Sequence, residues 1–187
     1  DLKATVYRDG KIWQQEYKEG KPQYDVKVVG ETDKRGTEVT FQPDDTIFVD
    51  LVYNYDTLAK RMRELSFLNK GITITLQDRR DSAARNEKGE LITETFHSEA
   101  GLTEFVKYID KSRVQLIPDI IYFEGEKNDI PVEVGMCYNT SYSENVHSYV
   151  NNINTYEGGT HLTGFKRGLT RTLKNFAEKS GMLNKLK

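Results

Sequence analysis

The sequence lacks the features that define disulfide-rich, membrane-spanning and strongly charged proteins. A single cysteine, Cys137, leaves no internal disulfide and fits a reducing compartment. No apolar run reaches the length of about 18 residues that a membrane helix needs, and no signal peptide is recognisable, so we expect a cytoplasmic protein without a membrane partner. The 27 basic residues nearly balance the 29 acidic ones, and a net charge of -2 gives no general attraction to nucleic acid.

What is present is typical of a folded soluble protein. Hydrophobic residues make up 36% of the sequence and charged residues 30%, and 187 residues suffice for one large domain or two small ones. The opening, DLKATVYRDG, lacks an initiator Met and enters alternating sequence almost at once, and the end, GMLNKLK, is similarly abrupt. We therefore expect a segment of a longer protein.

The first half of the chain alternates between strand and helix patterns. Asp9-Gly10 lies between two alternating runs and predicts a hairpin. Two further strands follow within residues 24–41, and the two-residue period places Val39 and Phe41 on one face. Residues 55–69 carry a helical stripe, and ITITL and LITETF predict paired strands joined by an exposed connection.

The second half begins at a candidate boundary near residues 96–101. Leu102, Phe105, Val106 and Ile109 form the apolar face of a short helix. A hairpin turning around residues 127–129 follows, then one strand within NVHSYVNNI, and a closing helix over about 161–180. Because the hairpins imply mostly antiparallel pairing, the predicted fold class is α+β.

The Gly158-Gly159 pair before the closing helix raises the question of a phosphate loop. A Walker loop needs Lys and Ser or Thr after its second glycine, and His161 and Leu162 stand there instead. Thr160 suits a helix N-cap and paired glycines suit a tight turn, so we favour a structural turn.

Neither the histidines nor the thiol forms a recognisable metal or catalytic motif. His97, His147 and His161 lack the spacing of a zinc site with each other or with cysteine. Cys137 lies in alternating sequence, which favours a buried structural thiol, while a Cys-His catalytic pair stays open as an alternative.

The closing helix and tail are basic. Arg167, Arg171 and Lys174 belong to a stripe that also includes Lys166, Lys179, Lys185 and Lys187, against Glu178 alone. Such a stripe can follow the phosphates of DNA, or it can be a solvated face whose cations the helix dipole favours. The second interpretation is the more common one for a soluble helix.

Four stretches of the chain are distinctive together: VYRDGKI with VVGETDKRGTEVTF, then YDTLAKRMRELSFLNKGI, then IYFEGEK, and finally NNINTYEGGTHLTGF. They resemble one family, the B subunits of bacterial DNA gyrases, which are the ATPase subunits of type II topoisomerases. The resemblance runs over nearly the whole chain, in order. The ATPase subunit of topoisomerase IV shares the architecture, but the LAKRMRELSFLNKG run is more similar to gyrase.

The resemblance implies two domains. Residues 1–100 would be the C-terminal half of a GHKL-type ATP-binding domain, an α/β sandwich. Residues 101–187 would be a transducer domain, incomplete at its C-terminal end, with a ribosomal-protein-like fold and a left-handed βαβ crossover against the usual handedness. Both imply an α+β chain.

The resemblance also gives three residues a role. Arg8 would lie at the rim of the nucleotide pocket, where coumarin drugs also bind in the family, Thr37 would help to hold the adenine, and Val39 would line the same pocket. The family's magnesium-binding asparagine, its catalytic glutamate and its switch lysine have no counterpart here. We therefore expect ATP and Mg2+ in the full protein, none bound to this chain, and no catalytic residue or ATPase activity in it.

The full protein implied by the resemblance couples ATP binding and hydrolysis to gate closure and negative supercoiling. Its partners would be the gyrase A subunit, DNA and a second copy of the B subunit. Two alternatives stay open: a fragment of the topoisomerase IV ATPase subunit, and a non-enzymatic module that binds nucleic acid or protein. In the second, the stripe of Arg167, Arg171 and Lys174 would make the contact.

Overall fold

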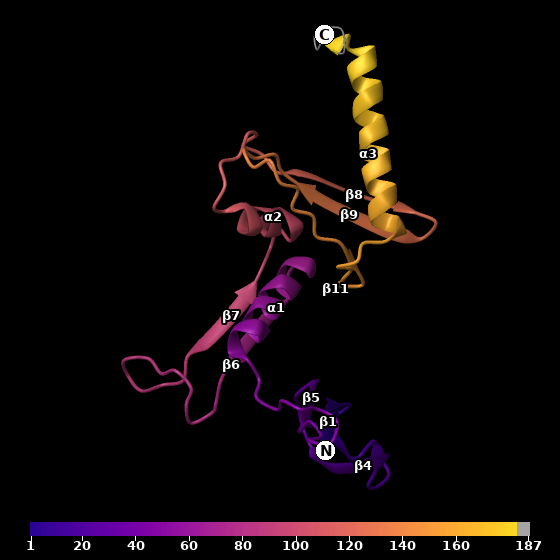
Figure 1. Cartoon of the computed structure of the whole chain (residues 1–187). Helices are drawn as coiled ribbons and strands as arrows, with labels where there is room; N and C mark the ends of the chain where they lie inside the picture. The colour runs from indigo at the N-terminus through magenta and orange to yellow at the C-terminus, as the bar shows by residue number, and fades with distance from the viewer. Residues whose placement is uncertain (183–187) are drawn as a thin grey trace. The chain divides into compact units, whose positions relative to one another are not determined.

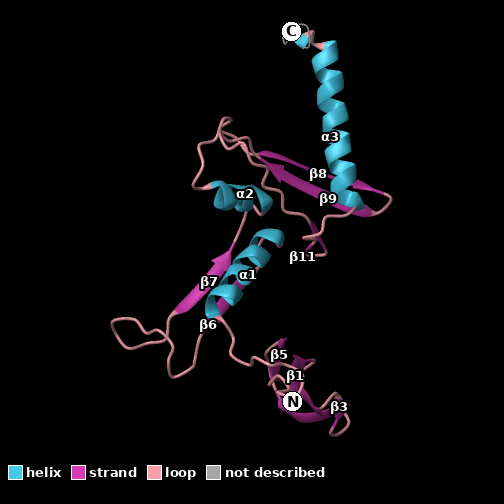
Figure 2. Ribbon diagram, in the orientation of Figure 1, coloured by secondary structure: helices cyan, strands magenta, loops and turns pink. Residues whose placement is uncertain are grey.

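A computed structural model describes residues 1–182 of the chain (Figure 1). These residues form three helices and eleven strands in two compact units, which divide between Asn54 and Tyr55. The α+β class is confirmed, because the described residues combine helices with strands and every strand pair among them is antiparallel (Figure 2).

The first unit is a twisted antiparallel sheet of five strands. Its strands are β1 (Leu2–Arg8), β2 (Lys11–Lys18), β3 (Lys21–Pro22), β4 (Lys27–Glu31) and β5 (Gly36–Phe41). β1 lies in the middle, with β2 on one side and β5 on the other, and β2 pairs at its far edge with β3 and β4. Residues 42–54 follow without helix or strand.

Two tight turns set the register of this sheet. Asp9 and Gly10 both have positive φ, of 55° and 75°, and this geometry matches the twist of a two-residue hairpin. The predicted hairpin is therefore confirmed, with Arg8 opposite Lys11. Glu19-Gly20 repeats the geometry between β2 and β3.

The second unit starts with a helix on a hairpin. α1 (Tyr55–Leu68) packs against β6 (Thr73–Gln77) and β7 (Thr93–His97). The two strands pair as predicted, and the charged connection between them is mostly exposed. α1 buries Ala59 and Ser66, and the Ser66 hydroxyl donates to the Arg63 carbonyl at 2.7 Å, so this buried polar group keeps a partner.

A second helix on a second hairpin completes the core of this unit. α2 (Leu102–Asp110) packs on β8 (Ile121–Lys127) and β9 (Ile130–Met136), and it also contacts α1. Phe105 stacks on Phe67 with ring centroids 5.3 Å apart. The buried hydrophobic residues of the described chain all lie in this unit: Ala59, Phe96, Phe105 and Val106. The predicted apolar face of α2 thus faces the core.

One lysine joins the loop after α1 to the β8–β9 hairpin. Lys70 Nζ donates to the Tyr122 hydroxyl at 2.8 Å and lies 3.0 Å from Glu133 Oε1. Its methylene stem lies over Gly101, so closely that a Cβ there would come within 2.7 Å of Lys70 Cγ and Cε. The loop after α1 is therefore fixed to the β8–β9 hairpin.

The chain between β9 and the last helix differs from the prediction. The single strand expected within NVHSYVNNI is wrong: β10 (Tyr149–Val150) and β11 (Ile153–Asn154) form a hairpin. The reason is that Asn151 and Asn152 both take positive φ, of 49° and 65°, and reverse the chain between them. α3 (Thr160–Lys179) then follows, close to the predicted bounds.

The two predicted domains remain a prediction. The predicted boundary lies near residue 100, whereas the compact units divide at residue 54, because α1 contacts α2 and thus joins residues 55–100 to the residues after 100. The left-handed crossover needs a parallel strand pair and also stays a prediction. None of the helices in the described part is both long and apolar enough to cross a bilayer.

Candidate functional site

The register of the first sheet brings three predicted site residues onto one face. Val6 lies opposite Thr37, and Ala4 lies opposite Val39. Residues directly opposite in an antiparallel pair share a face, and so do residues two apart in one strand. Arg8, two residues beyond Val6, is therefore a diagonal neighbour of Thr37 on the face that also carries Val39.

This face of the sheet, called here the apolar face, is rich in hydrophobic side chains. The same register adds further residues to it: Leu2, Ala4, Val6, Trp13, Tyr17, Val28 and Phe41. Val39 is 54% exposed and Phe41 57% exposed, although the Tyr53 ring meets that of Phe41 edge-on at 6.4 Å. A concentration of exposed apolar side chains on one face is typical of a binding or packing surface.

The opposite face of the same sheet is polar and internally bonded. The Tyr7 hydroxyl donates to Glu38 Oε2 at 3.1 Å, and Lys3 pairs with Glu16 at 3.7 Å. The Glu38 contact raises the pKa of Tyr7, because it favours the protonated phenol. The sheet is thus two-sided, and the predicted site residues all lie on its apolar side.

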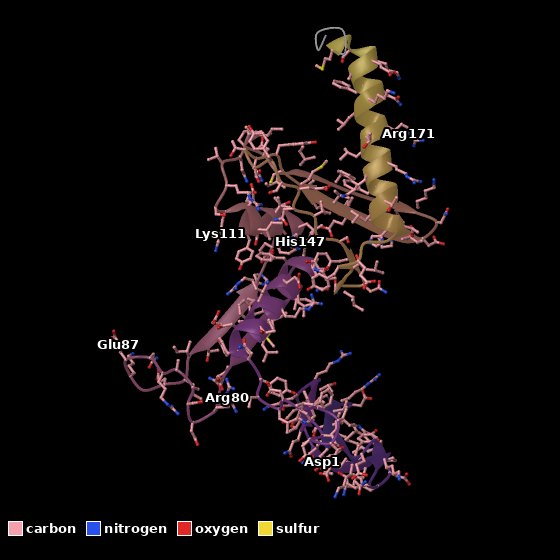
Figure 3. The ribbon with its side chains drawn as sticks, in the orientation of Figure 1. Asp1, Arg80, Glu87, Lys111, His147 and Arg171 are labelled. Atoms are coloured by element: carbon pink, nitrogen blue, oxygen red, sulfur yellow. The ribbon has the colours of Figure 1, made fainter. Side chains whose placement is uncertain are left out.

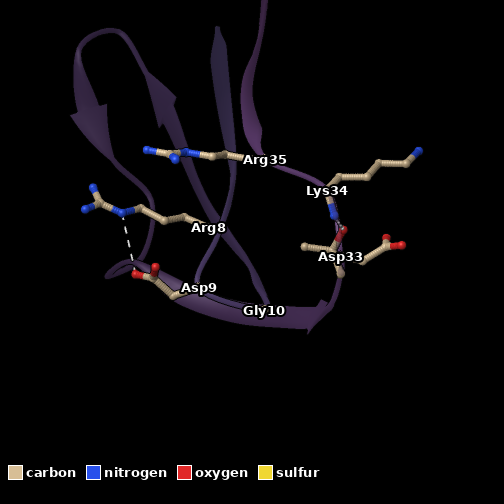
Figure 4. A pocket seen from close by; sticks show the side chains of 7 residues that line it. Arg8, Asp9, Gly10, Asp33, Lys34 and Arg35 are labelled. Carbon is tan, nitrogen blue, oxygen red and sulfur yellow. Dashed lines mark hydrogen bonds and ion pairs between the residues drawn. The ribbon is translucent and has the colours of Figure 1, made fainter.

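Arg8 also lines a small hollow at the end of β1 (Figure 4). The hollow has a volume of about 330 Å³ and a mixed lining: Arg8, Asp9, Gly10, Thr32, Asp33, Lys34 and Arg35. Arg8 Nε lies 3.5 Å from Asp9 Oδ2, and the Arg8 and Arg35 side chains extend in the same direction. Three cations against two carboxylates give the hollow a surplus of positive charge, which suits an anion.

Thr37 and Val39 do not line this hollow but lie along the adjoining strand. Sequence reasoning missed Lys34 and Arg35, which reach the hollow through the β4–β5 turn. The signal that could have found them is the charged run TDKRG, placed between two strands that pair on opposite sides of the β1–β2 hairpin.

The basic residues of α3 lie along its surface (Figure 3). Arg167, Arg171 and Lys174 are spaced by four and three residues, so they share one exposed face of the helix. Lys166, beside this stripe, pairs with Glu144 at 2.8 Å. Lys179 ends the helix, and Lys185 and Lys187 lie outside the described residues. The arrangement permits phosphate contacts and equally permits a solvated face.

The glycine pair before α3 forms a turn. Gly158 has a φ of 78°, and its N–H donates to the Thr155 carbonyl at 2.8 Å. The prediction of Thr160 as N-cap is wrong, because the helix begins one residue earlier. Gly159 holds the cap position, without a side-chain cap, and Thr160 is the first helical residue.

The thiol of Cys137 follows β9 and is partly buried. Its S–H donates to Asp110 Oδ2 at 3.3 Å, and burial together with this carboxylate raises the pKa of Cys137 to about 11. The Asp110 carboxylate is itself buried and accepts from Asn139 Nδ2 at 2.6 Å. Cys137 is therefore a protonated thiol that is only partly buried, where the prediction was a buried one, and in the described residues no histidine bonds to it.

The three histidines have separate surroundings. The Glu99 carboxylate, and then the Ile72 carbonyl, raise the pKa of His97. His147 lies near the Phe105 ring, and His161 bonds to Thr155. Within residues 1–182 no group of three or more His, Cys, Asp or Glu side chains is placed to share a metal ion.

Comparison with known proteins gives consistent findings over the whole chain. A family profile described as DNA gyrase B matches residues 101–187. The chain is 64% identical over 187 residues to the DNA gyrase B subunit of Cytophaga hutchinsonii, and 56% identical over 186 residues to that of Eisenibacter elegans. All of this chain is covered in both matches, but it spans only 38% of the length of either relative.

A solved structure agrees with these sequences. The 43K ATPase domain of Thermus thermophilus gyrase B, in complex with an aminocoumarin, superposes with a TM-score of 0.79 at 31% identity. The match covers 97% of this chain and 48% of that one. The fold of the chain is therefore that of a large part of this ATPase domain.

Proposed function

Because this chain belongs to the family of DNA gyrase B subunits, we propose that it forms part of the subunit that couples ATP binding and hydrolysis to gate closure and negative supercoiling of DNA. The observation that carries the proposal is the 64% identity with a gyrase B subunit across all 187 residues. The similarities do not favour the topoisomerase IV alternative, because these relatives are gyrase subunits.

In this proposal the apolar face of the first sheet forms one wall of the ATP site. Val39 packs against the adenine, and the Thr37 hydroxyl, which can donate and accept, meets the polar edge of the base. Arg8 lies at the rim, where the surplus positive charge of the hollow attracts an anionic group. An open apolar strand face with one hydroxyl and a cationic end fits the chemistry of a nucleotide.

By the resemblance, the asparagine that holds magnesium in the family has no counterpart in this chain. Among residues 1–182 no group of three or more His, Cys, Asp or Glu side chains could hold a metal ion. We place the groups that hold Mg2+ and activate water in the remainder of the full protein. The chain by itself is then expected to hydrolyse no ATP.

Residues from about 101 onward act in this proposal as the transducer, which carries the nucleotide state to the gate. The gyrase A subunit, DNA and a second copy of the B subunit are its proposed partners. For the nucleotide state to reach the gate, some structural element must have two positions, and the bound nucleotide must favour one of them. The contacts of α1 with α2 and with the β10–β11 hairpin join the two parts physically.

A threonine pair on one strand tests the proposed pocket. In the full-length protein, Thr37→Val keeps the shape of the side chain and removes its hydroxyl. We expect the affinity for a non-hydrolysable ATP analogue to fall about tenfold, the usual size for a lost hydrogen bond to a polar ligand group. Isothermal titration measures the affinity directly.

The matched control is Thr40→Val. Thr40 lies on the same strand, opposite Lys3, and therefore on the polar face. We expect analogue affinity within about twofold of the wild type for this variant. Equal losses for both threonines, or no loss for Thr37→Val, would contradict the placement of the adenine on the apolar face.

A further inference from the structure

The short hairpin of β10 and β11, residues 149–154, is too small to be stable alone. It has two residue pairs, Tyr149 with Asn154 and Val150 with Ile153. Its turn residues, Asn151 and Asn152, both lie in the left-handed region, which costs free energy for residues other than glycine. An isolated hairpin is marginal in water even when longer, so this one depends on support from elsewhere.

Helix α1 and the residue after it supply that support. Arg61 Nη2 donates to the Asn152 carbonyl at 2.6 Å, and Asn152 Nδ2 donates to Asn69 Oδ1 at 2.9 Å. Asn69 is held in turn by a bond from its Nδ2 to the Leu65 carbonyl at 2.8 Å. Both the backbone and the side chain of one turn residue are thus fixed by residues far earlier in the chain.

A third bond from α1 reaches the first strand of the hairpin. The Tyr149 hydroxyl donates to the Glu64 carboxylate, which also pairs with Arg61. Tyr149 is about half-buried, and its ring lies 6.2 Å from that of Phe105. Because hydrogen bonds are directional, this set of bonds fixes the register of the hairpin along α1, which apolar contacts alone would leave free to slide.

The other end of the hairpin continues to the base of α3. The Thr155 N–H donates to the Ser148 carbonyl at 2.8 Å, and the two hydroxyls lie 2.6 Å apart. Thr155 Oγ1 lies 3.2 Å from Nε2 of His161, in the first turn of α3. The His161 ring also lies over Gly159, where a Cβ would come within 2.7 Å of it.

α3 has few other contacts that could orient it. None of its residues is fully buried, and Phe176 is 59% exposed. Besides the bond at His161, the Lys166–Glu144 ion pair holds its first half, and both residues of that pair are exposed. An exposed ion pair contributes little. Leu162, Phe165 and Leu169 in the same half are only partly buried. The polar contacts that hold α3 therefore concentrate in its first half, beginning where its base meets the hairpin.

We infer that residues 149–154 are a positioning element, held by Arg61, Glu64 and Asn69, through which a displacement of α1 reaches the base of α3. The inference rests on the proposed function, since it names the contact that carries the nucleotide state into the transducer. The bond between Asn69 and Asn152 is its most specific element, because it joins two side chains that lie 83 residues apart in the sequence.

The test uses the full-length protein in complex with its partner subunit and DNA. Asn152→Gly removes the side chain and keeps the left-handed turn that glycine adopts freely. Asn69→Ala removes the other partner. The matched control is Asn128→Gly, in the β8–β9 turn, where Asn128 has a φ of 53° and, in the described residues, makes no bond to α1.

Three quantities are measured for each variant: the number of supercoils introduced per ATP hydrolysed, the affinity for a non-hydrolysable ATP analogue, and the melting temperature. We expect Asn152→Gly and Asn69→Ala each to lower the supercoils per ATP about fivefold. The double variant should lower the supercoils per ATP no further than Asn69→Ala alone, because both substitutions remove the bond between the two asparagines and Asn69→Ala also removes the bond to Leu65. Analogue affinity should stay within about twofold, and Asn128→Gly should match the wild type.

The outcomes separate this inference from the proposed function. A wild-type complex without ATP-dependent supercoiling would overturn both. A wild type that supercoils, with both asparagine variants fully coupled, would overturn the inference alone. The inference would also be overturned if analogue affinity and melting temperature fell in parallel with the supercoils per ATP. A purely structural role of the asparagines would lower all three quantities together.

Discussion

Residues 1–54 and residues 55–182 differ in how far they bury their apolar side chains. The second region covers its hairpins with α1 and α2 and buries Phe96, Phe105 and Val106. In residues 1–54, all of which the structure describes, no hydrophobic side chain is fully buried, although the apolar face of the sheet carries several. One region is thus built around its own core, and the other leaves an apolar sheet face partly exposed.

The largest expected effect lies in the core of the second region. Phe105→Ala removes a ring that is 7% exposed and stacked on Phe67. We expect the free energy of unfolding to fall by about 3–5 kcal/mol, because the lost transfer free energy adds to the cost of a cavity. Urea denaturation measures the change. A loss below about 1 kcal/mol would mean that the second region has no better core than the first.

The thiol of the second region reports its packing independently. Since the pKa of Cys137 is raised from 9.0 to about 11, we expect alkylation at neutral pH about a hundredfold slower than after unfolding in urea. The folded state holds this proton more tightly, so the associated stability is complete below pH 9 and is lost as pH rises toward 11. An equal alkylation rate in folded and unfolded protein would contradict the buried contact with Asp110.

A pair of glycines sharpens the comparison within one hairpin. A Cβ at Gly135 would meet Val106 Cγ2 at 3.1 Å and the Leu102 carbonyl at 3.3 Å, so Gly135→Ala should destabilise by about 1–3 kcal/mol. Gly125 in the neighbouring strand has open space, and Gly125→Ala should be neutral or slightly stabilising. Thermal unfolding distinguishes them. Equal effects would mean that α2 does not press on β9 as described.

The smallest expected effect lies on the open sheet of the first region. Val39→Thr changes a side chain that is 54% exposed, and we expect less than about 0.5 kcal/mol of change in the free energy of unfolding. The same urea experiment serves as the readout. A loss of about 2 kcal/mol would reveal a buried environment for Val39 and would remove the distinction between the two regions.

The sequence predicted those elements whose signals are local. Asp9-Gly10 marks a hairpin because both residues tolerate positive φ, and the stripe from Leu102 to Ile109 marks a buried helix face. The Asn151–Asn152 turn was not predicted from the sequence, because it lacks glycine and the strands that it joins are two residues long. The bonds that stabilise it come from α1, and no local pattern contains them.

The candidate site likewise combines residues that a local pattern indicates with residues that only the tertiary fold brings together. Arg8, Thr37 and Val39 were named through resemblance, and their common face follows from alternation once the register is known. Lys34 and Arg35 join Arg8 only through the order of strands in the sheet, which no single segment encodes. No sequence pattern indicated the buried Asp110 either, since Asn139, which donates to its carboxylate, is brought near by the tertiary fold.

The contact between Lys70 and Gly101 has a consequence for how related sequences diverge. Position 101 accepts no ordinary side chain, because its φ is 57° and the lysine stem occupies the space of a Cβ. The ammonium group at the end of that stem bonds to Tyr122 and Glu133. A homologue that shortens residue 70 frees the acidic and phenolic groups from their cation, so substitutions at 70, 122 and 133 are expected to occur together, with glycine retained at 101.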